Sequence, residues 1–397
     1  MKHAALLRRL AVLGCIVAAG TMLDPTAVSA QSPRGTDGVE VRWVIAAEPH
    51  GRVGAHQGPD GEFGRVVGVV LLRAGRIAVA DAGDQQIRVF DGMGALLTRW
   101  GRPGSGPGEF RNLVAIAGSM DSLLAFESAP GPSRFQAFHV VDGFVAGGEL
   151  RDDVGSLRVL GRFPTGEFLV SRGGFRSVQP PPLGQLQRDT IDVGIFAPSS
   201  QPSVTWIGKR PNNTWFSFPS GSSVTPLAIA RQPLGASLAA AASDRYAWIL
   251  DSQSGRVRIY GIDGRLAREM TLPVRRYTLS DKRIQQMRVA DLARAGNDFA
   301  RLRIEAQYSR STLPKYAPVF RRIVSGERAT VWVDLGPTED SRSSEAIVFT
   351  ASGQSLARVV LPPGFVLWHA GEDFVAGVEA DADGTESVVV YRLHRRR

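Results

Sequence analysis

The chain has 397 residues, of which 43% are hydrophobic, so it is long enough to bury a large core. Its only cysteine is Cys15, which excludes disulfide bridges within the chain and metal sites built from cysteines. The formal net charge of +9 comes almost wholly from arginine. This indicates either a surface for polyanions or a base composition that favours arginine, alanine and glycine codons.

The first 30 residues have the pattern of a secretory signal peptide. Basic residues precede an apolar run over 10–22, and small residues at 28–30 provide a cleavage site. Cys15 leaves a lipoprotein site as an alternative, although it lies inside the apolar run rather than after it. We therefore expect an exported protein, periplasmic or extracellular, and no nucleic-acid partner. No later segment is long and apolar enough to be a transmembrane helix.

An internal repeat begins with a predicted strand over 75–81. A polar turn leads to a second strand over 87–90, and a glycine-rich turn leads to a third over 95–100. The same pattern recurs further along the chain, where Asp251 corresponds to Asp81. Weaker copies complete a set of six, which begin near Gly75, Asp121, Gly166, Asp244, Arg328 and Glu372.

The shortest spacing between copies is about 45 residues, the length of one four-stranded propeller blade. We therefore predict an all-β fold, a six-bladed β-propeller of four-stranded antiparallel blades, with 31–397 as a single domain and a monomer. The sixth copy ends near Tyr391 without an outermost strand, and the alternating segment 39–48 belongs to no copy. This predicts that 39–48 is a ring-closing strand in the sixth blade.

Two regions depart from the repeat. The proline-rich segment 172–188 suits a surface excursion. The segment 278–310 has helical spacing, with Ser280 and Asn297 as N-caps and Gly296 at the end of the first of two helices. We predict a small helical insert between blades four and five. It is either a lid or docking surface, or a cover for apolar surface.

The motif over 63–110 resembles the NHL-repeat family. It has a strand ending in Ala-Asp, an Ile-x-Val-Phe-Asp strand and a glycine-rich exit that ends at Phe110. The resemblance implies a six-bladed propeller of an exported bacterial type. Related propellers include lactonase-type enzymes and an amidating lyase with a metal in the central channel, so a channel-site hydrolase or lyase is the alternative function. Their motifs are not matched residue by residue, and His139 and His369 fall on different blades, so we assign no catalytic residue, metal site or cofactor.

Three aspartates, Asp81, Asp251 and Asp334, recur at one position of the blade. A carboxylate at a turn accepts hydrogen bonds from backbone N–H groups, so we interpret them as structural turn acids. A ring of acids around a calcium ion is the alternative interpretation.

The starts of the inner strands should line the central depression of one face. By the blade register these positions are near Arg65, Arg111, Asn112 and Arg321. Their guanidinium groups favour an anionic or carboxylate-bearing ligand, and solvated loop arginines are the alternative. The predicted function is therefore a binding or scaffold protein whose partner is a protein, a peptide or an anionic glycan.

Overall fold

The structure is a computed structural model. It describes residues 41–54, 58–128, 133–174, 180–199, 202–222, 226–337, 343–381 and 383–395. The predicted signal peptide over 1–30 and the first two residues of the predicted strand 39–48 lie outside the described residues.

The first two blades are four-stranded antiparallel sheets in which the spatial order of the strands follows the chain. A 3-10 turn at Pro59–Gly61 precedes the first blade, and another at Arg73–Gly75 joins its first two strands. The strands of these blades are β3 (Val66–Leu71), β4 (Ile77–Asp81), β5 (Gln86–Phe90), β6 (Leu96–Trp100), β7 (Leu113–Ser119), β8 (Ser122–Glu127), β9 (Arg134–His139) and β10 (Gly143–Glu149).

The third blade has five strands rather than the predicted four, whereas the fourth has four. Two of its strands are 12 and 17 residues long, so they continue beyond the ring, and a short fifth strand pairs with the far end of the second of them. The strands of these blades are β11 (Arg158–Arg162), β12 (Phe168–Gly173), β13 (Leu186–Ala197), β14 (Ser203–Pro219), β15 (Leu227–Arg231), β16 (Leu238–Ser243), β17 (Tyr246–Asp251), β18 (Arg256–Gly261) and β19 (Leu266–Thr271).

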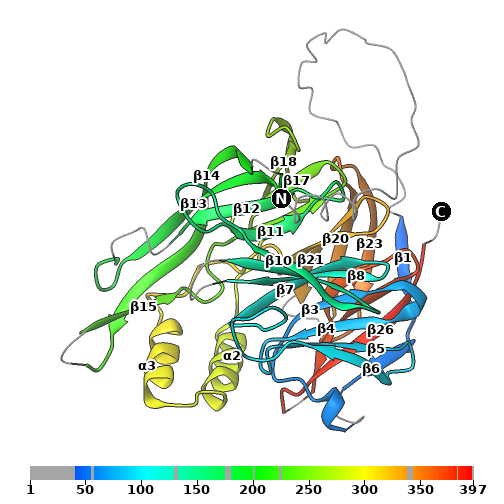
Figure 1. Cartoon of the computed structure of the whole chain (residues 1–397). Coiled ribbons are helices and arrows are strands. Elements are labelled where there is room, and N and C mark those ends of the chain that lie inside the picture. The colour runs from blue at the N-terminus through cyan, green and yellow to red at the C-terminus, as the bar shows by residue number, and fades with distance from the viewer. Residues whose placement is uncertain are drawn as a thin grey trace.

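The fifth and sixth blades are joined into one sheet by the N-terminal strands. β1 (Arg42–Ile45) pairs in parallel with the outer strand of blade five and antiparallel with the last strand of the chain, with which β2 (Gly51–Val53) also pairs. Figure 1 shows β1 beside β26. The other strands of these blades are β20 (Arg322–Gly326), β21 (Thr330–Pro337), β22 (Ser344–Thr350), β23 (Ser355–Leu361), β24 (Val366–Ala370), β25 (Phe374–Ala380) and β26 (Glu386–His394).

Six hydrophobic clusters lie between successive blades and hold them in a ring. Alternating side chains put one row of each sheet against the blade before it and the other row against the blade after it. One cluster packs Val69 and Val79 of blade one against Val378 and Val390 of blade six, so the first and last blades are in contact. The predicted six-bladed β-propeller is therefore confirmed.

The predicted helical insert is also confirmed, as α2 (Asp281–Ala293) and α3 (Asp298–Gln307) between β19 and β20. The Ser280 hydroxyl accepts a hydrogen bond from the N–H of Arg283 at 3.2 Å, and the Asn297 side chain accepts one from Ala300 at 2.8 Å. Both N-caps are those that the sequence predicts. No helix in the described part of the chain is long and apolar enough to cross a membrane.

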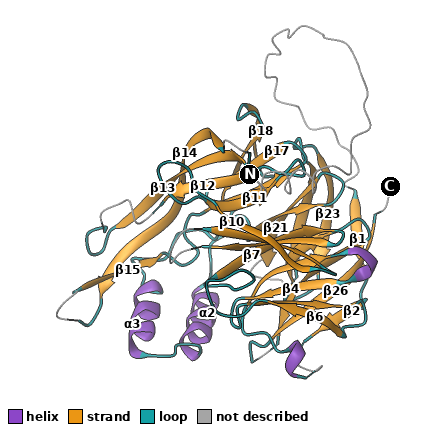
Figure 2. Cartoon of the chain, viewed as in Figure 1, coloured by secondary structure: helices purple, strands orange, loops and turns teal. Residues whose placement is uncertain are grey.

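The insert packs against the extension of blade three. Figures 1 and 2 show α3 below β15, with α2 beside α3. The rings of Phe218 on β14 and Phe299 on α3 lie 6.0 Å apart, yet Phe299 and Leu302 stay 48% and 46% exposed. Ile304 is the one residue of α3 that is buried, and α2 has none. The insert is therefore held by few buried contacts.

Candidate functional site

The three predicted turn acids occupy one structural position, the second-strand residue opposite the start of the first strand. Asp81 pairs with Val66 in this register, Asp251 with Leu238 and Asp334 with Arg322. This position places each carboxylate beside the loop that enters the blade.

Asp81 holds both the loop before its blade and the turn after it. Its carboxylate accepts hydrogen bonds from the N–H groups of Gly64 at 3.0 Å, Arg65 at 2.9 Å and Gly83 at 2.8 Å. It is 0% exposed, and the guanidinium of Arg88 lies 3.6 Å away. A buried carboxylate that accepts several N–H groups and faces a cation fixes the local backbone strongly.

The carboxylates of the other two acids also accept hydrogen bonds, but from different donor groups. Asp334 is buried and accepts from the N–H of Gly336 at 2.8 Å and from the guanidinium of Arg321 at 2.6 Å. Asp251 accepts from the backbone of Ser254 and pairs with Arg188. Burial raises the pKa of Asp251, but the hydrogen bonds from Ser254 and Arg188 outweigh it and leave that pKa below its ordinary value.

A fourth acid, Glu127, occupies the corresponding position of blade two, and the sequence comparison missed it. Glu127 pairs with Leu113 in the register, accepts from the N–H of Arg111 at 2.7 Å and forms an ion pair with Arg134 at 2.6 Å. The repeat is weak in blade two, and its acid is a glutamate, so an alignment of the repeats does not match it to the aspartates. Its place at the end of a predicted strand is the signal that could have found it.

These acids do not form a metal site in the part of the chain that the structure describes. No three His, Cys, Asp or Glu side chains among the described residues gather closely enough to hold a metal ion. His139 lies at the end of β9, the third strand of its blade, 2.9 Å from Asp142, whereas His369 is in the innermost strand β24.

The four predicted ligand-binding residues all lie directly before innermost strands, in three different blades. Arg65 is exposed, Arg111 has its Nε 3.9 Å from Glu127, and the Asn112 amide lies 3.5 Å from the Ser128 hydroxyl. Arg321 also donates to the carbonyl of Phe365 at 2.7 Å, and of the four it alone lines one of the pockets described next.

The insert pocket is a hollow of about 560 Å³ between the helical insert and the loops of blades three to five. Its floor and walls include five large apolar side chains, and three arginines enter it from separate elements. The lining residues are Arg231, Gln232, Pro233, Leu234, Gly235, Ser237, Tyr277, Leu279, Arg283, Met287, Gln307, Ala317, Pro318, Phe320, Arg321, Leu335, Gly336 and Pro337.

The charge of the insert pocket is unbalanced, because no acidic residue is among those that line it. The charge of Arg321 is neutralised by an ion pair with buried Asp334 at 2.6 Å. In contrast, no carboxylate of the described residues lies within ion-pair distance of Arg231 or Arg283. Buried Asp189 offsets part of the charge of Arg231 electrostatically, although it does not line the pocket. An apolar hollow with an excess of guanidinium groups has the composition of a site for an organic anion.

A second hollow adjoins the insert pocket, and a third adjoins the second. The loop pocket, of about 390 Å³, lies between the extension of blade three and residues 313–318, and Arg188, Arg276 and Lys315 are among its lining residues. The rim pocket, of about 440 Å³, lies between blades three and four and includes Arg210 and Asp251.

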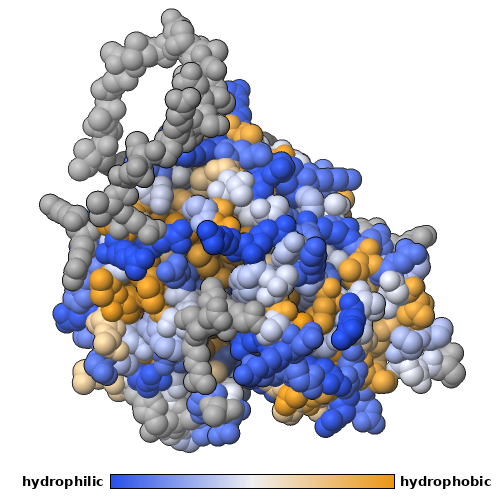
Figure 3. Space-filling model, turned by 180° about the vertical axis from the view of Figure 1, so that it is seen from behind, coloured by the Kyte–Doolittle hydropathy of each residue, from blue (hydrophilic) through white to orange (hydrophobic). Residues whose placement is uncertain are grey.

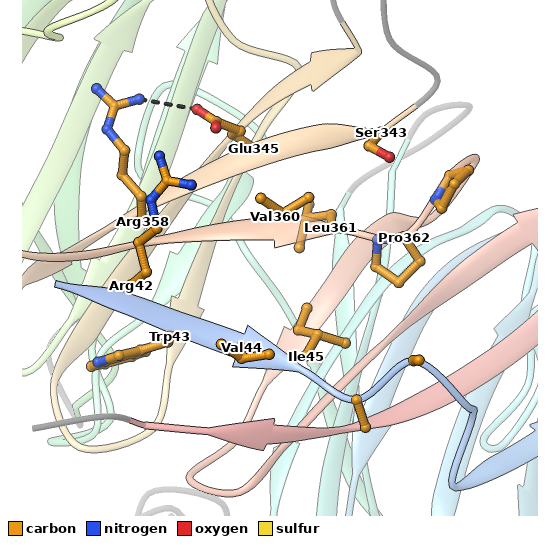
Figure 4. A pocket seen from close by; sticks show the side chains of 13 residues that line it. Arg42, Trp43, Val44, Ile45, Ser343, Glu345, Arg358, Val360, Leu361 and Pro362 are labelled. Carbon is orange, nitrogen blue, oxygen red and sulfur yellow. Dashed lines mark hydrogen bonds and ion pairs between the residues drawn. The ribbon is translucent and has the colours of Figure 1, made fainter. Parts of the chain in front are cut away.

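A fourth hollow, the seam pocket, lies where β1 joins blades five and six. It has a volume of about 500 Å³. In Figure 4 the side chains of Val44 and Ile45 on β1 face it from one side and Val360 and Leu361 from the other. At one end Arg358 is paired with Glu345 at 3.1 Å. Arg42 lies beside this pair in Figure 4, so the seam pocket is mostly apolar with charged side chains at one end.

On the surface behind the view of Figure 1, the visible described residues form no single dominant hydrophobic area. Figure 3 shows hydrophobic residues there in separate patches divided by hydrophilic bands.

No family model and no curated protein sequence matches the chain.

Several solved structures are similar to this chain in fold. A member of the DUF4221 family from Bacteroides vulgatus is 9% identical, covers 90% of this chain and 100% of its own, and has a TM-score of 0.46. The calcium-binding protein regucalcin from Agrobacterium tumefaciens is 12% identical over 90% of this chain and 98% of its own, with a TM-score of 0.39. A catalytically inactive virginiamycin B lyase from Staphylococcus aureus, crystallised with quinupristin, is 9% identical over 83% and 94%, with a TM-score of 0.39. At these identities the likeness concerns the fold alone.

Proposed function

We propose that the protein is a binding propeller that holds a carboxylate-bearing ligand in the insert pocket. The observation that carries the proposal is the pocket's lining, which combines three arginines and several apolar side chains with no acidic residue. The resemblance to NHL repeats and the expected export of the chain are compatible with this function and remain predictions.

The chemistry of the pocket supports an anion with an apolar side. A guanidinium donates two parallel hydrogen bonds to one carboxylate, and such charge-assisted bonds are stronger than neutral ones. Arg231 and Arg283 come from different elements, the last residue of β15 and the first turn of α2. Leu279, Met287 and Phe320 supply the apolar surface against which the rest of the ligand can pack.

The proposal is tested by calorimetric titration of the protein with galacturonate and with galactose, its neutral counterpart. We expect galacturonate to bind and galactose not to. Arg283→Gln and Arg231→Gln should each weaken binding about tenfold, because each removes a charge-assisted hydrogen bond.

The matched control is Arg265→Gln, which removes one charge from a turn between β18 and β19 where the side chain is 90% exposed. It should bind galacturonate as the unchanged protein does. Equal binding of galacturonate and galactose, or a loss in the control as large as in Arg283→Gln, would contradict the proposal. No observation on the described residues favours the hydrolase or lyase alternative.

A further inference from the structure

The insert, loop and rim pockets are three parts of one groove. The insert and loop pockets share Gln232, Leu234 and Pro318 among their lining residues. The loop and rim pockets share Arg188 and Arg276. The three pockets therefore adjoin one another in a row, which we call the groove.

The loop pocket repeats the charge imbalance of the insert pocket. None of its lining residues is acidic. The guanidinium of Arg276 lies 4.3 Å from the centre of the Tyr316 ring and the ammonium of Lys315 lies 5.3 Å from it. Two cations thus contact this ring, and no carboxylate of a described residue lies within ion-pair distance of either.

The rim pocket continues the row of cations with more of its charge neutralised. Arg188 pairs with Asp251, and Arg256 and Arg258 lie 3.5 and 2.8 Å from Glu269. Unbalanced positive charge therefore follows the insert and loop pockets in succession and declines toward the rim. Such a row fits a chain that carries a negative charge on each unit better than a single anion.

The backbone beside the groove favours a sugar chain over a peptide. A peptide in an extended site commonly adds to a free strand edge through main-chain hydrogen bonds. Here the segment between β15 and β16 is already bonded, with the N–H of Thr214 on the carbonyl of Ala236 and the N–H of Gln232 on the carbonyl of Thr214. The groove instead offers side chains, and Gln253 is exposed in both the loop and the rim pockets.

We propose, as an extension that rests on the proposed function, that the ligand is a linear oligosaccharide of uronic acids. One unit occupies the insert pocket and the next lies in the loop pocket, where Arg276 and Lys315 bind its carboxylate. Arg276 and Lys315 are then residues that select for chain length.

The test compares galacturonate with its linear trimer by calorimetry. Two linked units that bind together gain affinity without any new kind of contact, so we expect the trimer to bind at least about tenfold more tightly than the monomer. Arg276→Gln, and independently Lys315→Gln, should weaken trimer binding about fivefold to tenfold and leave monomer binding unchanged. Arg283→Gln should weaken both.

Each outcome decides between the two proposals. Monomer binding with no gain for the trimer overturns the oligosaccharide and leaves the proposed function standing, whereas no binding of either sugar overturns both. A glutamate oligomer of the same charge serves as the peptide probe, and tighter binding of that probe than of the trimer also overturns the oligosaccharide. The exposed side chains of Arg276 and Lys315 make both variants suitable for folding, which their melting temperatures check.

Discussion

At the scale of single residues, the buried carboxylates fix the loops that enter the blades. Asp81, Glu127 and Asp334 are nearly or fully buried, and each accepts bonds from the chain entering its own blade. The backbone N–H groups of each entering loop point at the buried carboxylate. Water could accept their hydrogen bonds only if the loop moved outward. A loss of one such acid therefore costs more than its individual hydrogen bonds suggest.

Asp81→Asn tests this role. An amide of the same shape keeps one acceptor but turns an NH₂ group toward backbone N–H donors, and it leaves Arg88 without its buried partner. We expect a loss of about 3 kcal/mol in the free energy of unfolding, measured by denaturant titration.

Asp263→Asn is the comparison for that variant, since Asp263 caps an exposed turn through one bond from Arg265 at 3.1 Å. Its cost should stay within about 0.5 kcal/mol. Similar losses in the two variants would show that Asp81 is an ordinary turn cap.

The position of these acids could be predicted from the sequence only where the repeat is regular. Asp81 and Asp251 stand in matching motifs, so their shared position is visible in the letters. Glu127 has the same role through a longer side chain, and one more methylene group changes the letter without changing the geometry. The three arginines and one asparagine predicted to bind a ligand lie directly before innermost strands, as the blade register indicates. The pairing of Arg321 with Asp334 could not be predicted in this way, because it depends on spatial contact between strands.

At the scale of elements, the helical insert differs from the blades in how it is held. Its limits follow from local chemistry, because Ser280 and Asn297 cap the helices through their own side chains. The surroundings of the insert do not follow from local chemistry, because the extension formed by β13, β14 and β15 has no counterpart among the described residues of the other blades. The insert pocket combines Arg231, Arg283 and Arg321, which are far apart in the sequence, so no local sequence pattern predicts the pocket.

Ile304→Ala tests whether the insert opens independently of the ring. Ile304 is the buried residue of α3, and shortening it removes about 2 kcal/mol of packing from an element with few other buried contacts. We expect amide hydrogen exchange in α2 and α3 to quicken about 30-fold, with no change in the blades.

Leu302→Ala is the matched change on the same helix, where the side chain is 46% exposed, and it should leave the exchange unaltered. Faster exchange throughout the blades of the Ile304 variant would mean that the insert and the ring unfold as one unit.

At the scale of the whole molecule, one short segment connects the ends of the ring. Residues 42 and 43 pair with blade five, residues 44 and 45 pair with blade six, and β2 continues along β26. Trp43 packs 5.8 Å from Trp332, which is fully buried in the cluster between these blades. The sequence indicates only the pairing with blade six, because one strand near the N-terminus has no blade and the last blade lacks a strand. The parallel pairing with blade five was not predicted.

A disulfide across that seam tests how far the seam controls stability. Val44 and His394 are direct antiparallel partners and both are exposed, so Val44→Cys with His394→Cys fits the separation that a disulfide needs. With Cys15→Ser these are the only thiols. A bond that closes nearly the whole chain should add about 5 kcal/mol to the free energy of unfolding, measured in denaturant against the reduced protein. The comparison is a disulfide between Arg256→Cys and Thr271→Cys, which are paired inside blade four, where the short closed loop predicts about 3 kcal/mol.

The seam disulfide could instead raise the free energy of unfolding by no more than the disulfide inside blade four. That result would contradict the prediction and show that the seam does not control the opening of the ring.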